Sequence, residues 1–276
     1  MLLALSIPHL IERYGDDYVL LVDTADSSGA QTHLESYEAE RRAERHRSTT
    51  APVPAMVLHG HAWVGCALYV AVLLAVALMI ANGYGRLDAF DRGALDGAAV
   101  QRGEWWRAWT ALTLHLDAAH IAANLGAGCW FGYLASRQLG SGTAWFLTVT
   151  GAAAANLVEG EFGPPTHSAV GASTAVFTAL GLAAAYSWRM RFDLRTRWAV
   201  RWGPLVAGVA LLGWFGSAGE DTDVVGHAGG FAAGILLGAA AGVPVIGAWL
   251  RRVPQWLSGT AALLSIAVAW AYALAP

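Results

Sequence analysis

Seven stretches of about 20 mostly apolar residues dominate the sequence, and each is long enough to cross a bilayer as a helix. Their approximate limits are 61–81, 120–137, 142–158, 168–188, 199–217, 224–243 and 257–274. Only helices and closed barrels satisfy every backbone polar group in lipid, and these continuous runs lack the alternation of barrel strands. We therefore expect an all-α, polytopic membrane protein.

Composition supports a membrane location and excludes other protein classes. Hydrophobic residues make up 56% of the 276 residues, and charged residues only 13%, about half the share of a typical soluble domain. The formal net charge of -3 offers no basic surface to nucleic acid, so the bilayer is the expected partner. Cys66 and Cys129 lie in apolar runs, where we expect small buried residues rather than a disulfide.

The positions of arginine predict the orientation of the helices. All 17 basic residues are arginines, and thirteen of them fall on one side if the seven spans alternate. That side should be cytoplasmic, which places the N-terminus inside and the C-terminus outside. The exceptions, Arg86, Arg92, Arg102 and Arg107, share one long external loop, where the charge rule is weaker and a structured segment is expected.

Charge and proline divide the chain into four predicted segments. They are a small cytoplasmic region at 1–50, a linker at 51–60, a six-helix membrane core at 61–243, and a cytoplasmic loop with a seventh transmembrane helix at 244–276. Within the first segment, 17–23 is predicted to be a strand and 32–47 a charged helix. The opening apolar run is too short for a cleaved signal peptide.

A few polar residues lie in or beside the apolar spans, where each needs a partner or a function because burying polar groups is costly. All fall towards the external half of the membrane: His115, His120, Asn124, Ser173, Thr174 and His227. A lone membrane serine most often bonds back to its own helix. His227 borders glycines at every fourth position from 226 to 238, a stripe that lets another helix approach closely. It should face that helix, either as a base or as a bridging histidine.

His120 and Asn124 are four residues apart and so share one helix face. They fit either two donors to an oxyanion or a polar pair that bridges helices. His115 and His120 are five apart with no carboxylate completing a ligand set, so no metal site is predicted. His167 is taken as a surface residue, and the acidic loop 217–223 as a mobile lid.

Four separated segments within residues 61–242 resemble the rhomboid family of intramembrane serine proteases. Trp105-Trp106-Arg107 is similar to the family's Trp-Arg motif, and HLDAAHIAAN at 115–124 to its His-x4-His-x3-Asn signature. Gly171-Ala172-Ser173 resembles the Gly-x-Ser nucleophile motif. His227 with Gly230 and Gly234 resembles the family's His-x2-Gly-x3-Gly helix.

The resemblance implies a six-helix bundle with an additional C-terminal transmembrane helix, in a bacterial inner membrane. It implies a serine endopeptidase for transmembrane protein substrates that needs no cofactor. Ser173 would be the nucleophile and His227 the general base, while His120, Asn124 and the Ser173 backbone N–H would bind the oxyanion. The other motif residues would have structural roles; they are Trp106, Arg107, His115, Gly171, Gly230 and Gly234. Arg107 would donate hydrogen bonds to loop carbonyls.

One residue departs from the family pattern. Thr174 follows the serine where the family usually has glycine, and its side chain would crowd the approach of the sixth span to the fourth. A catalytically inactive rhomboid-like protein that binds membrane clients is therefore the alternative. A transporter is disfavoured because the inner halves of the second, fourth and sixth spans are apolar.

Overall fold

The computed structural model describes residues 7–15, 17–49, 58–83, 86–192, 198–216 and 223–275. The chain divides into two compact units, Met1–Ala55 and Met56–Pro276. Most of the predicted linker, residues 51–57, lies outside the described residues, and so does the predicted lid up to residue 222.

The first unit is a β-hairpin followed by a helix. Strands β1 (His9–Tyr14) and β2 (Asp17–Val22) pair antiparallel, and helix α1 covers Ser27–Thr49. The predicted strand coincides with β2, and the predicted helix lies within α1. Strand β1 was not predicted, because the charged pair Glu12 and Arg13 breaks up its apolar pattern.

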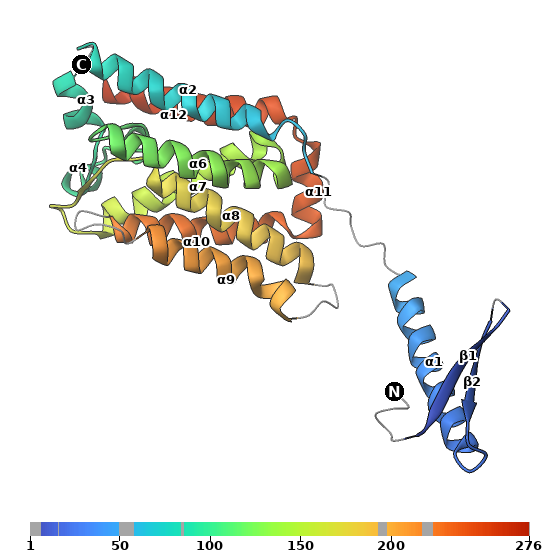
Figure 1. Cartoon of the computed structure of the whole chain (residues 1–276). Coiled ribbons are helices and arrows are strands. Elements are labelled where there is room, and N and C mark those ends of the chain that lie inside the picture. The colour runs from blue at the N-terminus through green and yellow to red at the C-terminus, as the bar shows by residue number, and fades with distance from the viewer. Residues whose placement is uncertain are drawn as a thin grey trace. The chain divides into compact units, whose positions relative to one another are not determined.

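Long helices form the second unit, and Figure 1 shows them side by side. They are α2 (Ala62–Ala81), α6 (Ala118–Leu139), α7 (Ser141–Phe162), α8 (Ser173–Phe192), α9 (Trp198–Phe215), α10 (Val224–Ala241) and α12 (Gln255–Ala273). Each overlaps one of the seven predicted spans, which confirms the all-α, polytopic membrane fold.

Shorter helices lie at the two ends of this bundle. Helices α3 (Arg86–Gly93) and α4 (Gly97–Gln101) lie at one end with the C-terminus, whereas α11 (Pro244–Arg252) lies at the other (Figure 1). Helix α5 (Arg107–Thr110) and the 3-10 helix η2 (Ala111–Thr113) continue the α3–α4 segment towards α6. The long loop expected to be structured is thus helical in most of its described part.

Among the described residues, α2, α9, α10 and α12 are long and apolar enough to cross a membrane by length and composition alone. Helices α6, α7 and α8 fall below that standard. Residues 174–187 of α8 are all buried, because α6, α7, α9 and α10 pack around it. A helix that faces protein rather than lipid can carry small and polar residues. The protein is an integral membrane protein with α8 at its centre.

The fourth span was predicted to begin at residue 168, and this boundary is wrong. Strand β4 (Ser168–Ala169) pairs antiparallel with β3 (Leu95–Asp96), so these residues are extended. Gly171 then has a φ of 135°, which a right-handed helix excludes and which favours glycine. Helix α8 therefore begins at Ser173, and the serine lies at the start of the helix rather than inside it.

The glycine stripe of α10 contacts the backbone of α8. A Cβ atom added at Gly230 would meet the carbonyl oxygen of Thr174, and one added at Gly234 would meet that of Thr178. Gly181 of α8 has the reciprocal relation with the Phe231 carbonyl. Backbone thus lies against backbone at successive turns, and no side chain separates the two helices there.

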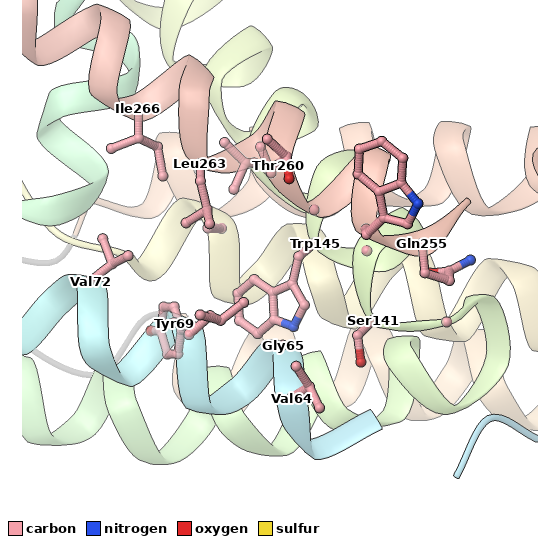
Figure 2. Close-up of a pocket in the computed structure, with 18 of the residues that line it drawn as sticks. Val64, Gly65, Tyr69, Val72, Ser141, Trp145, Gln255, Thr260, Leu263 and Ile266 are labelled. Atoms are coloured by element: carbon pink, nitrogen blue, oxygen red, sulfur yellow. The ribbon is translucent and has the colours of Figure 1, made fainter. Parts of the chain in front are cut away.

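A cavity of about 560 Å³ lies between α2, α7 and α12. Figure 2 shows Val64 and Tyr69 of α2 facing Leu263 of α12 across it, with Trp145 of α7 between them. Ser173 is not among its lining residues. The cavity is mostly apolar, and Ala172 and Ala175, close to the serine in the chain, both line it.

We predict that Gly234→Ala lowers thermal stability by about 1–3 kcal/mol, because the new methyl group overlaps backbone atoms that cannot move aside. Gly229→Ala is the matched control on the same helix, since a Cβ there would lie 3.6 Å from the Ala155 Cβ, an ordinary contact. Thermal unfolding in detergent measures both. Equal unfolding temperatures for the two variants would contradict the close contact between α8 and α10.

Candidate active site

The backbone before Ser173 is attached to the segment that precedes α6. The Gly171 N–H donates to the Ala111 carbonyl at 2.9 Å, and the Ala172 N–H donates to His115 Nε2 at 3.3 Å. These two bonds and the positive φ of Gly171 fix the direction in which α8 begins. These contacts therefore fix the position of Ser173 at the N-terminal end of α8.

The ring of His120 lies against this same turn. A Cβ atom at Gly171 would lie 2.7 Å from His120 Nε2 and 3.6 Å from Ser173 Oγ. The rings of His115 and His120 meet edge to face, with centroids 5.0 Å apart. The structure thus brings together His115, His120, Gly171 and Ser173. Glycine is required at 171 both for its φ and for the space that His120 occupies.

His115 acts on the turn as a neutral hydrogen-bond acceptor. It lies in the loop between η2 and α6, where burial, followed by the proximity of His120, lowers its pKa from 6.5 to about 4. A neutral imidazole has one ring nitrogen free to accept a hydrogen bond, and Nε2 accepts that of the Ala172 N–H. Protonation would remove this acceptor.

His227 lies in the first turns of α10 and is only 7% exposed. Its Nδ1 lies 2.9 Å from the Gly216 carbonyl oxygen, which can only accept a hydrogen bond. We therefore assign the proton to Nδ1, which leaves Nε2 as the basic nitrogen. The ring packs on Phe177, with centroids 4.6 Å apart, and Phe177 is one turn beyond Ser173 on the same face of α8. His227 therefore faces the side of α8 that carries the serine.

Asn124 is buried on α6, one turn after His120. Its side-chain amide donates to the His120 backbone carbonyl at 3.1 Å. The backbone carbonyl of Asn124 accepts a hydrogen bond from the Tyr69 hydroxyl at 2.8 Å. One of the two amide N–H groups is used within the helix, and the second is available to a ligand.

Trp106 and Arg107 organise the segment between α2 and α6. The guanidinium of Arg107 donates to the carbonyls of Asp91 and Ala94, both at 2.8 Å, and pairs with Glu104. The Trp106 indole donates to the Arg92 carbonyl, and its ring stacks on Tyr272 of α12. These contacts connect the loop to itself and to the C-terminal helix.

Thr174, the departure from the family pattern, is buried between α8 and α10. Its methyl carbon lies 3.0 Å from the position that a Cβ at Gly230 would take. The two helices still touch there because residue 230 has no side chain. The Thr174 methyl group thus occupies space that the glycines of α10 leave empty.

A polar cluster beside this site has no counterpart among the sequence predictions. Glu159 of α7, His167 of the following loop and Asp223 before α10 each have a possible ligand atom within 4.8 Å of the others. The third span is predicted to end at 158, which leaves Glu159 outside the predicted intramembrane groups. His167, expected at the surface, is partly buried: its side chain is 23% exposed, and its Nε2 lies 3.3 Å from Glu159 Oε1.

Comparisons with known proteins agree with this arrangement. The family model described as the Rhomboid domain matches residues 102–243, about half of the chain. The rhomboid protease GluP of Bacillus subtilis (strain 168) is 34% identical over 182 residues, which cover 65% of this chain. The chain spans about a third of the length of that curated relative, at 34%. No solved structure matches. With a family model that covers half of its length, the chain belongs to the rhomboid family.

Proposed function

We propose that this protein is an intramembrane serine endopeptidase that uses Ser173 and His227 as a catalytic dyad. The observation that carries the proposal is the 2.9 Å distance between His227 Nδ1 and the Gly216 carbonyl oxygen, from which the tautomer of His227 is assigned. Because Nδ1 is occupied by the Gly216 carbonyl, the free Nε2 belongs to a buried ring that faces the serine side of α8. A hydrogen-bonded carbonyl that orients a base does the work of the third group in a triad.

In this mechanism His227 Nε2 takes the proton of Ser173 Oγ as the oxygen attacks a substrate carbonyl. The same nitrogen then delivers the proton to the leaving amine, and the acyl-enzyme forms. Water, deprotonated by His227, hydrolyses the ester and regenerates the serine.

The negative oxygen of the tetrahedral intermediate needs preorganised donors. Ser173 is the first residue of α8, so its backbone N–H belongs to the unpaired first turn of a helix. His120 lies against the same turn, and the second amide N–H of Asn124 is the remaining donor. Losing one such donor typically costs on the order of 3 kcal/mol of transition-state stabilisation.

The proposed substrates are transmembrane proteins cleaved near the external face. The turn before Ser173 bonds to the segment that follows α3 and α4, at the end of the bundle where the C-terminus also lies (Figure 1). The arginine pattern favours this end as external and the N-terminus as cytoplasmic. In line with the family resemblance, we place the core in a bacterial inner membrane.

Thr174 favours one alternative, a rhomboid-like protein that binds membrane clients without cleaving them. Its buried side chain stands next to the serine, where it would oppose any closer approach of α10 during the reaction. The same fold can carry either function, so the site must be tested directly.

We predict that a fluorophosphonate probe labels the purified protein on Ser173. Labelling should vanish in Ser173→Ala and slow by about 100-fold or more in His227→Ala, because the general base is lost. Gel fluorescence measures the rates, and circular dichroism checks the helical fold. A folded wild-type protein that takes up no label would support the client-binding alternative instead.

Relieving the contact at residue 174 should preserve or raise the labelling rate. Thr174→Ala removes the methyl and hydroxyl groups next to Gly230 and keeps high helix propensity, whereas Thr174→Gly also adds a helix cost of about 1 kcal/mol. We expect both variants to remain active, with the glycine variant less stable to heat. A loss of labelling in a folded alanine variant would show that Thr174 is needed, contrary to the crowding argument.

The turn before Ser173 should weaken in acid through His115. Its pKa of about 4 lies below the ordinary 6.5, so the unfolded chain takes up a proton first as the pH falls. The stability due to neutral His115 is complete above pH 6.5 and is lost progressively towards pH 4. The unfolding temperature of wild type should therefore fall more steeply over this window than that of His115→Gln, which cannot be protonated. Parallel curves would contradict this role.

A further inference from the structure

We propose that Glu159, His167 and Asp223 form a binding site for a divalent transition-metal cation, with Zn²⁺ as its probe. One possible ligand atom from each residue lies within 4.8 Å of the others. Carboxylate oxygens and an imidazole nitrogen are a ligand set that zinc accepts. The residues come from α7, from the loop that leads to β4 and from the start of α10, so only the fold brings them together.

Glu159 supplies the strongest reason to expect a cation. Its side chain is only 6% exposed, and its Oε2 atom is buried without a hydrogen-bond partner among the described residues. The other oxygen, Oε1, lies 3.3 Å from His167 Nε2, in a contact too poorly aligned to be a hydrogen bond. A buried carboxylate oxygen with no donor is costly unless a proton or a cation satisfies it.

Asp223 brings a second negative charge to the same point. Its Oδ1 accepts the Gly226 N–H at 2.9 Å and so caps α10, which leaves Oδ2 to face the Glu159 carboxyl group. A Cβ atom at Gly226 would meet both this Oδ2 and the unpartnered Oε2 of Glu159, so the two oxygens border the same glycine. Among the described residues no arginine pairs with either carboxylate. His167 is the basic group that faces them.

His167 completes the set from a fixed position. Its backbone N–H donates to the Pro164 carbonyl at 2.9 Å, and its backbone carbonyl accepts a hydrogen bond from the Gly97 N–H at 3.0 Å. Backbone hydrogen bonds to Pro164 and Gly97 thus hold His167 in place. Its Nε2 faces the carboxylates and has no hydrogen-bond partner among the described residues. Ligand atoms of tetrahedral zinc lie about 3.4 Å apart, so the three side chains need to close only slightly.

A cation at this point would join the three segments around the candidate nucleophile. Asp223 is one turn before His227 on α10, and it also lines a small recess with Ser173 and Thr174. Binding would therefore hold the start of α10 against the end of α7. The expected effect is a more stable external end of the bundle, whether or not the serine is reactive.

The test is a Zn²⁺ titration of the full-length protein in detergent after treatment with a chelator and its removal. We expect one Zn²⁺ per chain at this site, with affinity at least about tenfold weaker in Glu159→Gln and in Asp223→Asn. Glu161→Gln is the matched control, because Glu161 is exposed on the same helix. Asp223→Asn keeps an oxygen that can cap α10, so it provides a second variant should Glu159→Gln fail to fold.

Thermal unfolding gives an independent readout. Zn²⁺ should raise the unfolding temperature of wild type and Glu161→Gln, and leave both site variants unchanged, because a ligand of the folded state stabilises it. Absence of zinc binding to wild type, or equal binding and equal temperature shifts in Glu159→Gln and Glu161→Gln, would overturn the proposal. These zinc measurements do not depend on the reactivity of Ser173, which labelling by the fluorophosphonate probe measures separately.

Discussion

The contact between the α8 and α10 backbones is the constraint on which the rest of the site depends. Glycines at 230, 234 and 238 leave no side chain between these helices, so the carbonyl groups of α8 lie directly against α10. Close helix packing of this kind is how membrane proteins replace the hydrophobic effect, which does not drive helices together within lipid. It places the buried ring of His227 against Phe177, one turn beyond Ser173 on the same helix face.

A second constraint fixes the serine from the opposite side. Gly171 adopts a φ that ends the preceding extended segment, and bonds to Ala111 and His115 hold the turn in place. The segment between α2 and α6 carries those partners, and Arg107 in turn holds that segment by donating hydrogen bonds to its carbonyl groups. Residues far from the serine in sequence thereby determine the direction in which α8 starts.

Hydropathy predicted the long helices well because each is long enough to cross a bilayer and consists mostly of apolar residues. The glycine stripe of α10 and the shared face of His120 and Asn124 were also readable, since helical spacing alone defines them. The start of α8 was not, because a two-residue strand and one positive φ depend on tertiary partners. The cluster of Glu159, His167 and Asp223 escaped for the same reason: its members are far apart in the chain and follow no local spacing.

In the proposed mechanism, the glycine-mediated contact between α8 and α10 places a base with a free Nε2 beside Ser173. An experimental structure of the protein after reaction with a fluorophosphonate tests it most directly. We expect phosphorus bonded to Ser173 Oγ, the His227 Nε2 within hydrogen-bond distance of that oxygen, and Nδ1 still hydrogen-bonded to the Gly216 carbonyl. An unmodified serine, or an adduct from which the His227 ring is separated by several ångströms with its Nδ1 bond broken, would contradict it.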